Sequence, residues 1–377
     1  SQTEGQRLLT CIPAMLLCYW CFGYGAWLCL ALMLAAGIIA HHQKLSALLA
    51  VGILLLPATQ YPATTWWSKP DLDREYVLSL DVEHYFGNIQ KMRKHLETDR
   101  QILWVTYYRN LYNATHPSEI NSPVSLSRNL LAWNQPGTNG LILPVNPSAS
   151  FLSILFANEL WFTLGDMTMA EHCAMLSMIF SPRNSGSRMI KRLAEINLVN
   201  GDDEAALKYL RILDKTLLHK SWAEKRIPGQ QTPRVKEWLE KKRRDIPTQD
   251  QLRSGNDAVT SLQNLVASNA GNLRAYEYLL CYHLLSKDLR SFVEDYVPGK
   301  VSSPIFAEAL LIHLARQGNI RAEELIKYQI PVEIAKEFAD YTRLYEAKDT
   351  SLKEKYGKTY WFYYHFATTE PGKESKP

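Results

Sequence analysis

Motifs that mark common catalytic centres are missing from this chain. It contains no H-E-x-x-H, no G-x-S-x-G, no P-loop and no G-x-G-x-x-G sequence. Its ten histidines are scattered. The adjacent His172 and Cys173 would point in different directions on a helix, whereas a closed metal site needs several convergent ligands. We therefore predict no catalytic residue, no metal site and no cofactor.

A strong charge bias and a cysteine framework are also lacking. The formal net charge of +4 is too small to predict nucleic-acid binding, which usually requires a strongly basic face. Six cysteines in 377 residues do not make a disulfide scaffold. Cys18 and Cys21 have the spacing of a redox or metal pair, but their hydrophobic surroundings favour small residues buried in a membrane. Cys173 and Cys281 either pair or, as we prefer, remain as two thiols buried in helices.

Charged residues are absent from Leu8 to Ala40, which is longer than one membrane span of about 20 residues. The sequence Cys-Phe-Gly-Tyr-Gly at 21–25 indicates a turn, so we favour two short spans at 8–21 and 26–40 over one long helix. Leu45 to Tyr61 is the last predicted span. Residues 1–61 are thus predicted to be a transmembrane region with two or three spans.

The loops between the predicted spans give an orientation. Loops with basic residues tend to stay on the cytoplasmic side of a membrane, and this charge rule favours that side for the loop His41 to Lys44. Residues 62–377 then lie on the extracytoplasmic (periplasmic) side. Because the first residue is Ser rather than Met, we expect a processed chain or part of a longer one.

The region 62–377 carries repeated amphipathic helix pairs, and we predict an all-α fold. The most regular pairs lie at 151–180 and 189–213, with Gly165 and Gly201 at their turns. A small residue follows each glycine by five positions, Ala170 in the first pair and Ala206 in the second. The two glycines are 36 residues apart, which is close to the period of about 34 residues in tetratricopeptide (TPR) repeats.

The second pair resembles a degenerate tetratricopeptide repeat at its large, small and turn positions, which are Leu193, Ala194, Gly201, Ala206 and Leu210. The resemblance implies a TPR-like α-solenoid of helical hairpins. The whole layout also resembles an uncharacterised bacterial membrane-protein family, in which membrane spans precede a helical region containing K-R-L-A-E-x-N-L-x-N-G, here Lys191 to Gly201. That family has no assigned activity.

Two segments interrupt the repeats. Turn-forming dipeptides predict a long loop at 114–149. The segment 215–253 carries eleven Lys or Arg and five Asp or Glu, with a basic patch at Lys241, Lys242, Arg243 and Arg244. This segment is either a solvated helix with its linker, which we favour, or a contact for anionic lipid headgroups or an acidic partner.

Two clusters have a structural and a functional interpretation. Asp202, Asp203 and Glu204 stand where a helix begins, where carboxylates stabilise exposed N–H groups, and this explains them without a cation. The aromatic segment Leu352 to Phe366 is predicted to be one helix that closes the end of the solenoid, in preference to a site for sugar or peptide.

These features predict a membrane-anchored scaffold that binds an unidentified protein partner at the surface of the lipid bilayer. The inner helices of stacked hairpins line a groove. The candidate groove residues are Asn158, Arg188, Lys191, Arg192, Asn197 and Tyr278. The alternative is the soluble accessory part of a larger polytopic enzyme of the glycosyltransferase type, with its catalytic residues upstream. Oligomeric state does not follow from the sequence.

Overall fold

The computed structural model describes residues 71–97, 102–115, 140–145, 151–181, 186–248 and 257–367. The chain divides into two compact units, residues 1–75 and 76–377. The predicted spans within 1–61 and most of the predicted loop 114–149 lie outside the described residues. Among the helices that are described, none combines the length and apolarity needed to cross a membrane.

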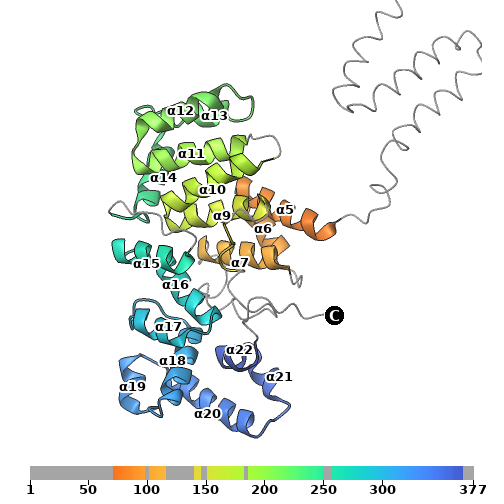
Figure 1. Cartoon of the computed structure of the whole chain (residues 1–377), viewed down its shortest axis with the longest axis vertical. Helices are drawn as coiled ribbons and strands as arrows, with labels where there is room; N and C mark the ends of the chain where they lie inside the picture. Colours follow the sequence, from red (N-terminus) through yellow and green to blue (C-terminus); the bar gives the residue numbers. More distant parts are fainter. Residues whose placement is uncertain are drawn as a thin grey trace, which may run out of the picture. The chain divides into compact units, whose positions relative to one another are not determined.

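The described residues form helices, turns and irregular segments and contain no strand, which confirms the all-α prediction (Figure 1). The helices are α5 (Leu72–Phe86), α6 (Ile89–Leu96), α7 (Leu103–Thr115), α9 (Phe151–Leu164), α10 (Met167–Phe180), α11 (Ser187–Asn200), α12 (Asp203–Asp214), α13 (Lys220–Glu224), α14 (Pro233–Arg243), α15 (Ala258–Ser268), α16 (Leu273–Leu285), α17 (Leu289–Asp295), α18 (Pro304–Arg316), α19 (Ala322–Lys327), α20 (Val332–Glu346), α21 (Leu352–Tyr356) and α22 (Tyr360–Phe366).

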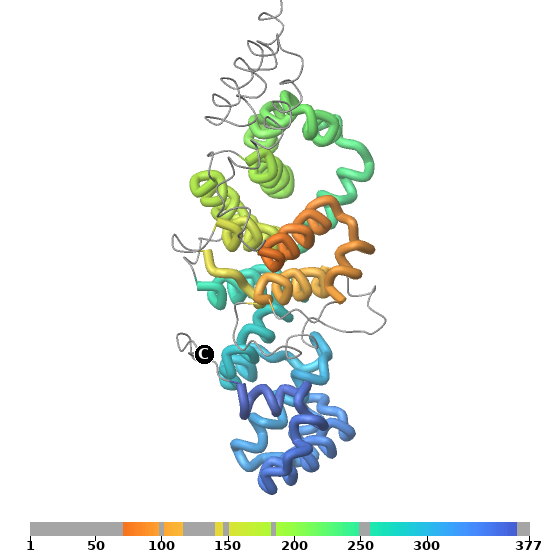
Figure 2. The backbone as a smooth tube through the Cα atoms, turned by 90° about the vertical axis from the view of Figure 1, so that its right-hand side faces the viewer, coloured from red at the N-terminus to blue at the C-terminus, as the bar shows by residue number. Residues whose placement is uncertain are grey.

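Helices in the second unit pack mainly against their neighbours in the chain. The most extensive contacts join α9 to α10, α11 to α12, α10 to α11 and α15 to α16. In Figure 2, where colour follows residue number, segments of similar colour lie side by side. More distant contacts join α11 to α14 and α18 to both α20 and α22. A large apolar core runs through these elements, and two smaller clusters lie beside it at α10–α13.

The two regular hairpins are built as the sequence predicts. Gly165 and Gly201 adopt φ angles of +90° and +83°, which favour glycine because a side chain crowds the backbone there. The next residue caps the following helix, since Asp166 accepts from the amide of Met169 and Asp202 from that of Ala205. Asp202 therefore has the helix-capping role that the acidic run predicted.

The small residues at these hairpins and both described cysteines are buried. Ala170 and Ala206 are fully buried, which permits close approach of the paired helices. Cys173 and Cys281 are both buried inside helices, as predicted. Burial raises the pKa of the Cys281 thiol well above its ordinary value, so this side chain acts as a small apolar residue.

The prediction of one continuous helix from Leu352 to Phe366 is wrong. The segment is divided into α21 and α22 by a turn in which the amide of Gly357 donates to the carbonyl of Lys353 at 2.9 Å. Thr359 then caps α22 by accepting from the amide of Phe362. The break lets Tyr360 and Trp361 become fully buried, and α22 contacts α18.

Candidate functional site

A network of buried charges joins α5, α9 and α11. Arg188 makes a bidentate contact with Asp81, at 2.6 Å from Nη1 to Oδ2 and 2.8 Å from Nη2 to Oδ1. Its Nη2 also donates to Oε1 of Glu159 at 2.9 Å. Arg192, one helical turn further along α11, donates to Oε2 of Glu159. Two arginines on one face of α11 thus share the Glu159 carboxylate, and side chains from three helices become one unit.

Asn158 supports this network from a fully buried position. Its amide donates to the carbonyl of Ala170 at 2.6 Å, and its side-chain oxygen accepts from Nε of Arg192 at 2.9 Å. Arg192 also donates to Glu195 at 2.9 Å and stacks over the ring of Phe162, 3.8 Å from the centroid. The guanidinium of Arg192 is therefore held on several sides and does not move freely.

The arginines determine the charge of Glu159. Burial alone would raise the pKa of this carboxyl, but Arg192, a hydrogen bond from His84 and the nearby Arg188 together hold it well below its ordinary value of 4.5. In turn, although burial would lower the pKa of Arg188, Glu159 and Asp81 raise it. Glu159 and Arg188 are thus ionised at neutral pH.

A second row of cations lies against aromatic rings and forms no ion pair within the described residues. Lys191 lies 4.5 Å from the ring centroid of Tyr85 and 5.2 Å from that of Trp222. Arg226 stacks on Trp222 at 4.1 Å. The ion-paired Arg188 of the first network also lies 4.8 Å from the ring centroid of Tyr85. Burial lowers the pKa values of both Lys191 and Arg226. The nearby Glu195 carboxylate acts on both cations without forming an ion pair with either, so part of their positive charge stays available to a further anion.

Lys242 reaches the same region from α14. Its Nζ lies 4.6 Å from the ring centroid of Phe162 and donates to the Phe162 carbonyl at 3.5 Å. Burial, followed by repulsion from Arg192 and Arg274, lowers the pKa of Lys242 to about 8. The Phe162 ring is therefore contacted by two cations, Arg192 and Lys242.

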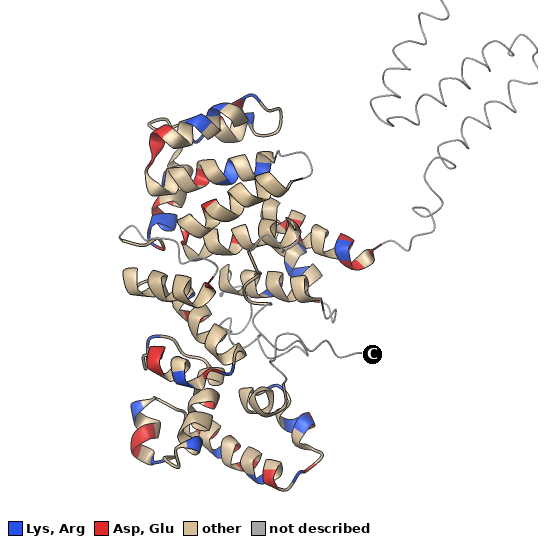
Figure 3. Cartoon of the chain, in the orientation of Figure 1, with Lys and Arg blue, Asp and Glu red and all other residues tan. Residues whose placement is uncertain are grey.

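We call this region the cation–aromatic site. Figure 3 shows Lys and Arg in blue and Asp and Glu in red along α11 and α14. It consists of the cations Arg188, Lys191, Arg192, Arg226 and Lys242, the carboxylates Asp81, Glu159 and Glu195, and the rings Tyr85, Phe162 and Trp222. Five cations face three carboxylates, so 5 − 3 leaves an excess of two positive charges. Such a surface favours an anionic ligand.

The structure brings together four of the six predicted groove residues, Asn158, Arg188, Lys191 and Arg192. Asn197 lies on the same helix, but its amide donates to the carbonyl of Leu193 at 2.7 Å. Asn158 in α9 and Tyr278 in α16 require a correction, since both are fully buried and neither is available to a partner. The Tyr278 ring packs in the core, which an aromatic residue on the apolar face of a helix favours.

Other residues of the site were not predicted. Glu159 carries the only charge in α9, and one carboxylate in an otherwise uncharged helix is a signal for a buried partner. Asp81, Tyr85 and Trp222 gave no comparable signal, because they come from α5 and α13, which the sequence does not connect to α11. Arg226 lay within the predicted basic segment without being singled out.

The predicted basic patch is divided by the fold. Lys242 joins the cation–aromatic site, as described above. Arg243 donates to the carbonyls of Val199 at 3.0 Å and Leu198 at 2.8 Å, and so satisfies the end of α11. Lys241 and Arg244 are exposed. The four residues therefore do not act as one surface.

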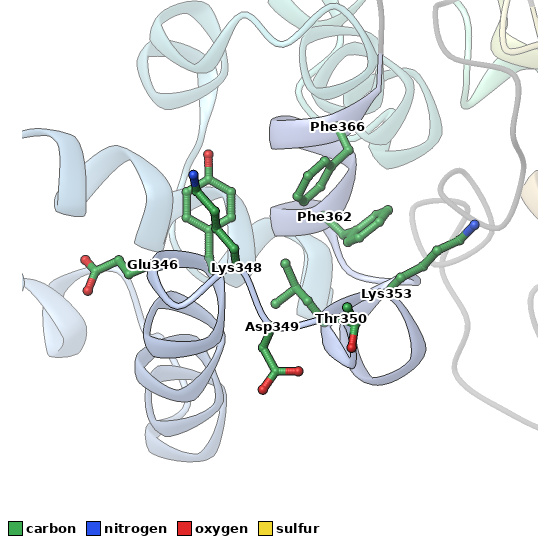
Figure 4. A pocket seen from close by; sticks show the side chains of 9 residues that line it. Glu346, Lys348, Asp349, Thr350, Lys353, Phe362 and Phe366 are labelled. Carbon is green, nitrogen blue, oxygen red and sulfur yellow. The ribbon is translucent and has the colours of Figure 1, made fainter.

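A pocket of 620 Å³ lies between the end of α20, α21 and α22 (Figure 4). Phe362 and Phe366 project into it from α22, opposite the segment 345–353. Its rim carries two lysines and two acidic residues, so no charge excess selects a ligand: Lys348, Lys353, Glu346 and Asp349. Elsewhere in the described ranges, no group of three or more His, Cys, Asp or Glu could hold a metal ion.

Comparison with known protein families matches residues 47–367 to a family of unknown function, DUF6057. The chain belongs to this family. No curated protein and no solved structure matches the chain. Membership in DUF6057 confirms the predicted relation to an uncharacterised family. Lys191, Arg192 and Glu195, which lie in the motif that suggested the relation, contribute three charges to the cation–aromatic site.

Proposed function

We propose that this member of DUF6057 is a membrane-anchored, TPR-like scaffold that binds an acidic segment of a protein partner at its cation–aromatic site. The observation that carries the proposal is the set of partly buried cations that lie against aromatic rings and form no ion pair within the described residues, Lys191, Arg226 and Lys242. Desolvating a cation costs free energy unless an anion compensates for it. A partner carboxylate would supply that compensation.

A protein segment suits the site better than a small anion. The cations are distributed over α11, α14 and the turn after α13, so one small ion would not contact all of them. Asp81 and Glu159 are already paired, and they position Arg188 and Arg192 without adding free charge. A rigid, pre-oriented surface lowers the entropy cost of binding an extended chain. Aromatic and Arg side chains are also enriched where protein partners bind.

The solenoid and the membrane anchor are further parts of the proposal. The packing of each helix on its neighbour in the chain and the repeated Gly–Asp hairpins at 165–166 and 201–202 support a TPR-like arrangement. The uncharged run from Leu8 to Ala40 supports an anchor. In this proposal residues 62–377 lie on the extracytoplasmic side, as the charge rule favours.

Charge reversal tests partner binding. In full-length chain purified from its native membranes in mild detergent, Lys191→Glu/Arg226→Glu should reduce recovery of the partner by about tenfold, because attraction becomes repulsion. Quantitative mass spectrometry of the purified material gives the ratio. The neutral pair Lys191→Gln/Arg226→Gln should give a smaller loss.

The matched control is Lys336→Glu/Arg321→Glu, which reverses the same two residue types at exposed positions on α20 and before α19. It should leave recovery unchanged. Repeated recovery of the wild-type chain alone, or equal loss in both double variants, would contradict the proposal.

Lys242 is expected to reduce stability while it serves binding. Its pKa in the folded chain, about 8, lies below the ordinary value of 10.5. The buried charge therefore costs stability in full below pH 8, where Lys242 is protonated in both the folded and the unfolded chain. This cost becomes smaller as the pH rises towards 10.5, because the folded chain then holds Lys242 in its neutral form. Lys242→Met should therefore raise the free energy of unfolding by about 1 kcal/mol at pH 7 and have little effect near pH 10. Urea titrations at both pH values measure this difference. If Lys242→Met is less stable than wild type at pH 7, the buried charge of Lys242 does not destabilise the fold.

A further inference from the structure

The turn between α12 and α13 exposes two adjacent leucines. Leu217 is 97% exposed and Leu218 is 85% exposed, and Ile212 near the end of α12 is 48% exposed. Isolated exposed apolar residues are common, but two consecutive leucines at almost full exposure are not what a water-facing turn requires. Neither leucine is among the residues of the cation–aromatic site.

The tip has a defined structure. Thr216 donates from Oγ1 to the carbonyl of Leu213 at 2.7 Å, and the same oxygen accepts from the amide of His219 at 3.2 Å. The amide of Lys220 donates to the carbonyl of Thr216 at 3.2 Å, which begins α13. Leu213 and Ala223 on either side are buried together in a small apolar cluster. These contacts hold the ends of the turn and direct Leu217 and Leu218 outward.

Basic residues flank the leucines on both sides. Lys215 precedes them and Lys220 follows them, and both are exposed. From Arg211 to Lys225 the chain has four basic and two acidic residues, all of them exposed: Arg211, Lys215, Lys220 and Lys225 against Asp214 and Glu224. Figure 3 shows blue bands along α12 and α13. Positive charge next to an apolar tip complements a surface that is anionic outside and apolar beneath.

We propose that this tip inserts Leu217 and Leu218 into the interface of an anionic lipid bilayer while Lys215 and Lys220 contact the headgroups. Lysines suit this position because their long side chains reach headgroups while neighbouring leucines enter the acyl boundary. The inference rests on the membrane location in the proposed function. It adds a second contact with the bilayer, at a distance in sequence from the apolar N-terminal run.

A lipid surface fits the tip better than a protein groove. The charges that border the leucines are exposed lysines, whereas the core of a protein interface is depleted of charged residues and especially of Lys. The backbone amides of Leu217 and Leu218 also donate no hydrogen bond within the described part of the chain. They therefore exchange rapidly in water and report contact with a bilayer sensitively.

Hydrogen exchange of the full chain in lipid nanodiscs tests the inference. Discs of phosphatidylcholine containing about one-third phosphatidylglycerol should slow exchange at 216–219 by about tenfold relative to pure phosphatidylcholine. Leu217→Ser/Leu218→Ser should abolish the difference. Ile326→Ser is the control, because Ile326 on α19 is 77% exposed but lies elsewhere in the chain, and it should preserve the difference.

Equal exchange at 216–219 on the two lipid compositions, or a difference that survives in the double serine variant, would overturn the inference. Slowing that requires an added protein rather than anionic lipid would overturn it as well and would assign the tip to a protein partner. None of these results alters the partner recovery measured with the Lys191 and Arg226 variants, so failure here is distinguishable from failure of the proposed function.

Discussion

Glu159→Gln should lower the free energy of unfolding by about 3 kcal/mol, because removing one member of a buried ion network leaves its partners with uncompensated charge. Arg188 and Arg192 both pair with Glu159, whose side chain is only 7% exposed. For a chain of this size the loss corresponds to a fall in Tm of roughly 4–5 °C. Calorimetry or urea unfolding of the full chain measures it.

The surface pair Lys208–Glu204 provides the control, since its side chains are 68% and 88% exposed. Glu204→Gln should change stability by less than about 0.5 kcal/mol. The pH dependence gives a second readout. The folded pKa of Glu159 lies below 4.5, so its contribution is present above that pH and is lost as the pH falls further. Wild type should therefore lose more stability on acidification than Glu159→Gln, and identical acid profiles would contradict the network.

Gly165→Ala should destabilise the fold by about 3 kcal/mol or more, through backbone strain and a steric clash. The glycine has φ +90°, and a Cβ atom there would lie 2.3 Å from the carbonyl oxygen of Asp245. Asn272 fixes the same contact, because its amide donates to the carbonyls of Leu164 at 2.7 Å and Asp245 at 2.8 Å. The clash is therefore with held backbone and cannot be relieved by a rotamer change.

Gly201→Ala is the matched control. Gly201 has a similar φ of +83° at the equivalent turn, but a Cβ atom there would have no heavy atom within 4 Å. Gly201→Ala should lower the free energy of unfolding by only about 1 kcal/mol, which is the cost of holding alanine at a positive φ angle. Equal losses in the two variants, measured by urea unfolding, would show that Asp245 does not press on the turn between α9 and α10.

The sequence predicts the local elements of this fold well. The hairpins at Gly165 and Gly201, the cap at Asp202 and the buried small residues Ala170 and Ala206 all follow from short-range patterns. Helix periodicity and capping depend on residues three or four positions apart, so they are visible in one dimension. The break at Gly357 was missed because its aromatic neighbours suggested a continuous helix.

The candidate site was only half visible in the sequence. Its α11 residues were predicted, since Arg188, Lys191 and Arg192 lie on a helix that was recognised as part of a repeat. Their partners come from residues more than 25 positions away, such as Glu159 and the more distant Asp81. Nothing in local pattern shows which face of α5 or α13 meets α11. The ion pairs between α11 and the other helices therefore could be identified only from the tertiary structure.

Site-specific photo-crosslinking tests the central claim, binding of an acidic partner segment, most directly. Tyr85 is replaced by a photoreactive aromatic residue in the full chain, next to Arg188 and Lys191, and Tyr345 on α20 serves as the control position. We expect a crosslink from position 85 to a protein segment rich in Asp and Glu, and we expect Lys191→Glu/Arg226→Glu to abolish it. No crosslink at position 85, or the same products from both positions, would contradict it.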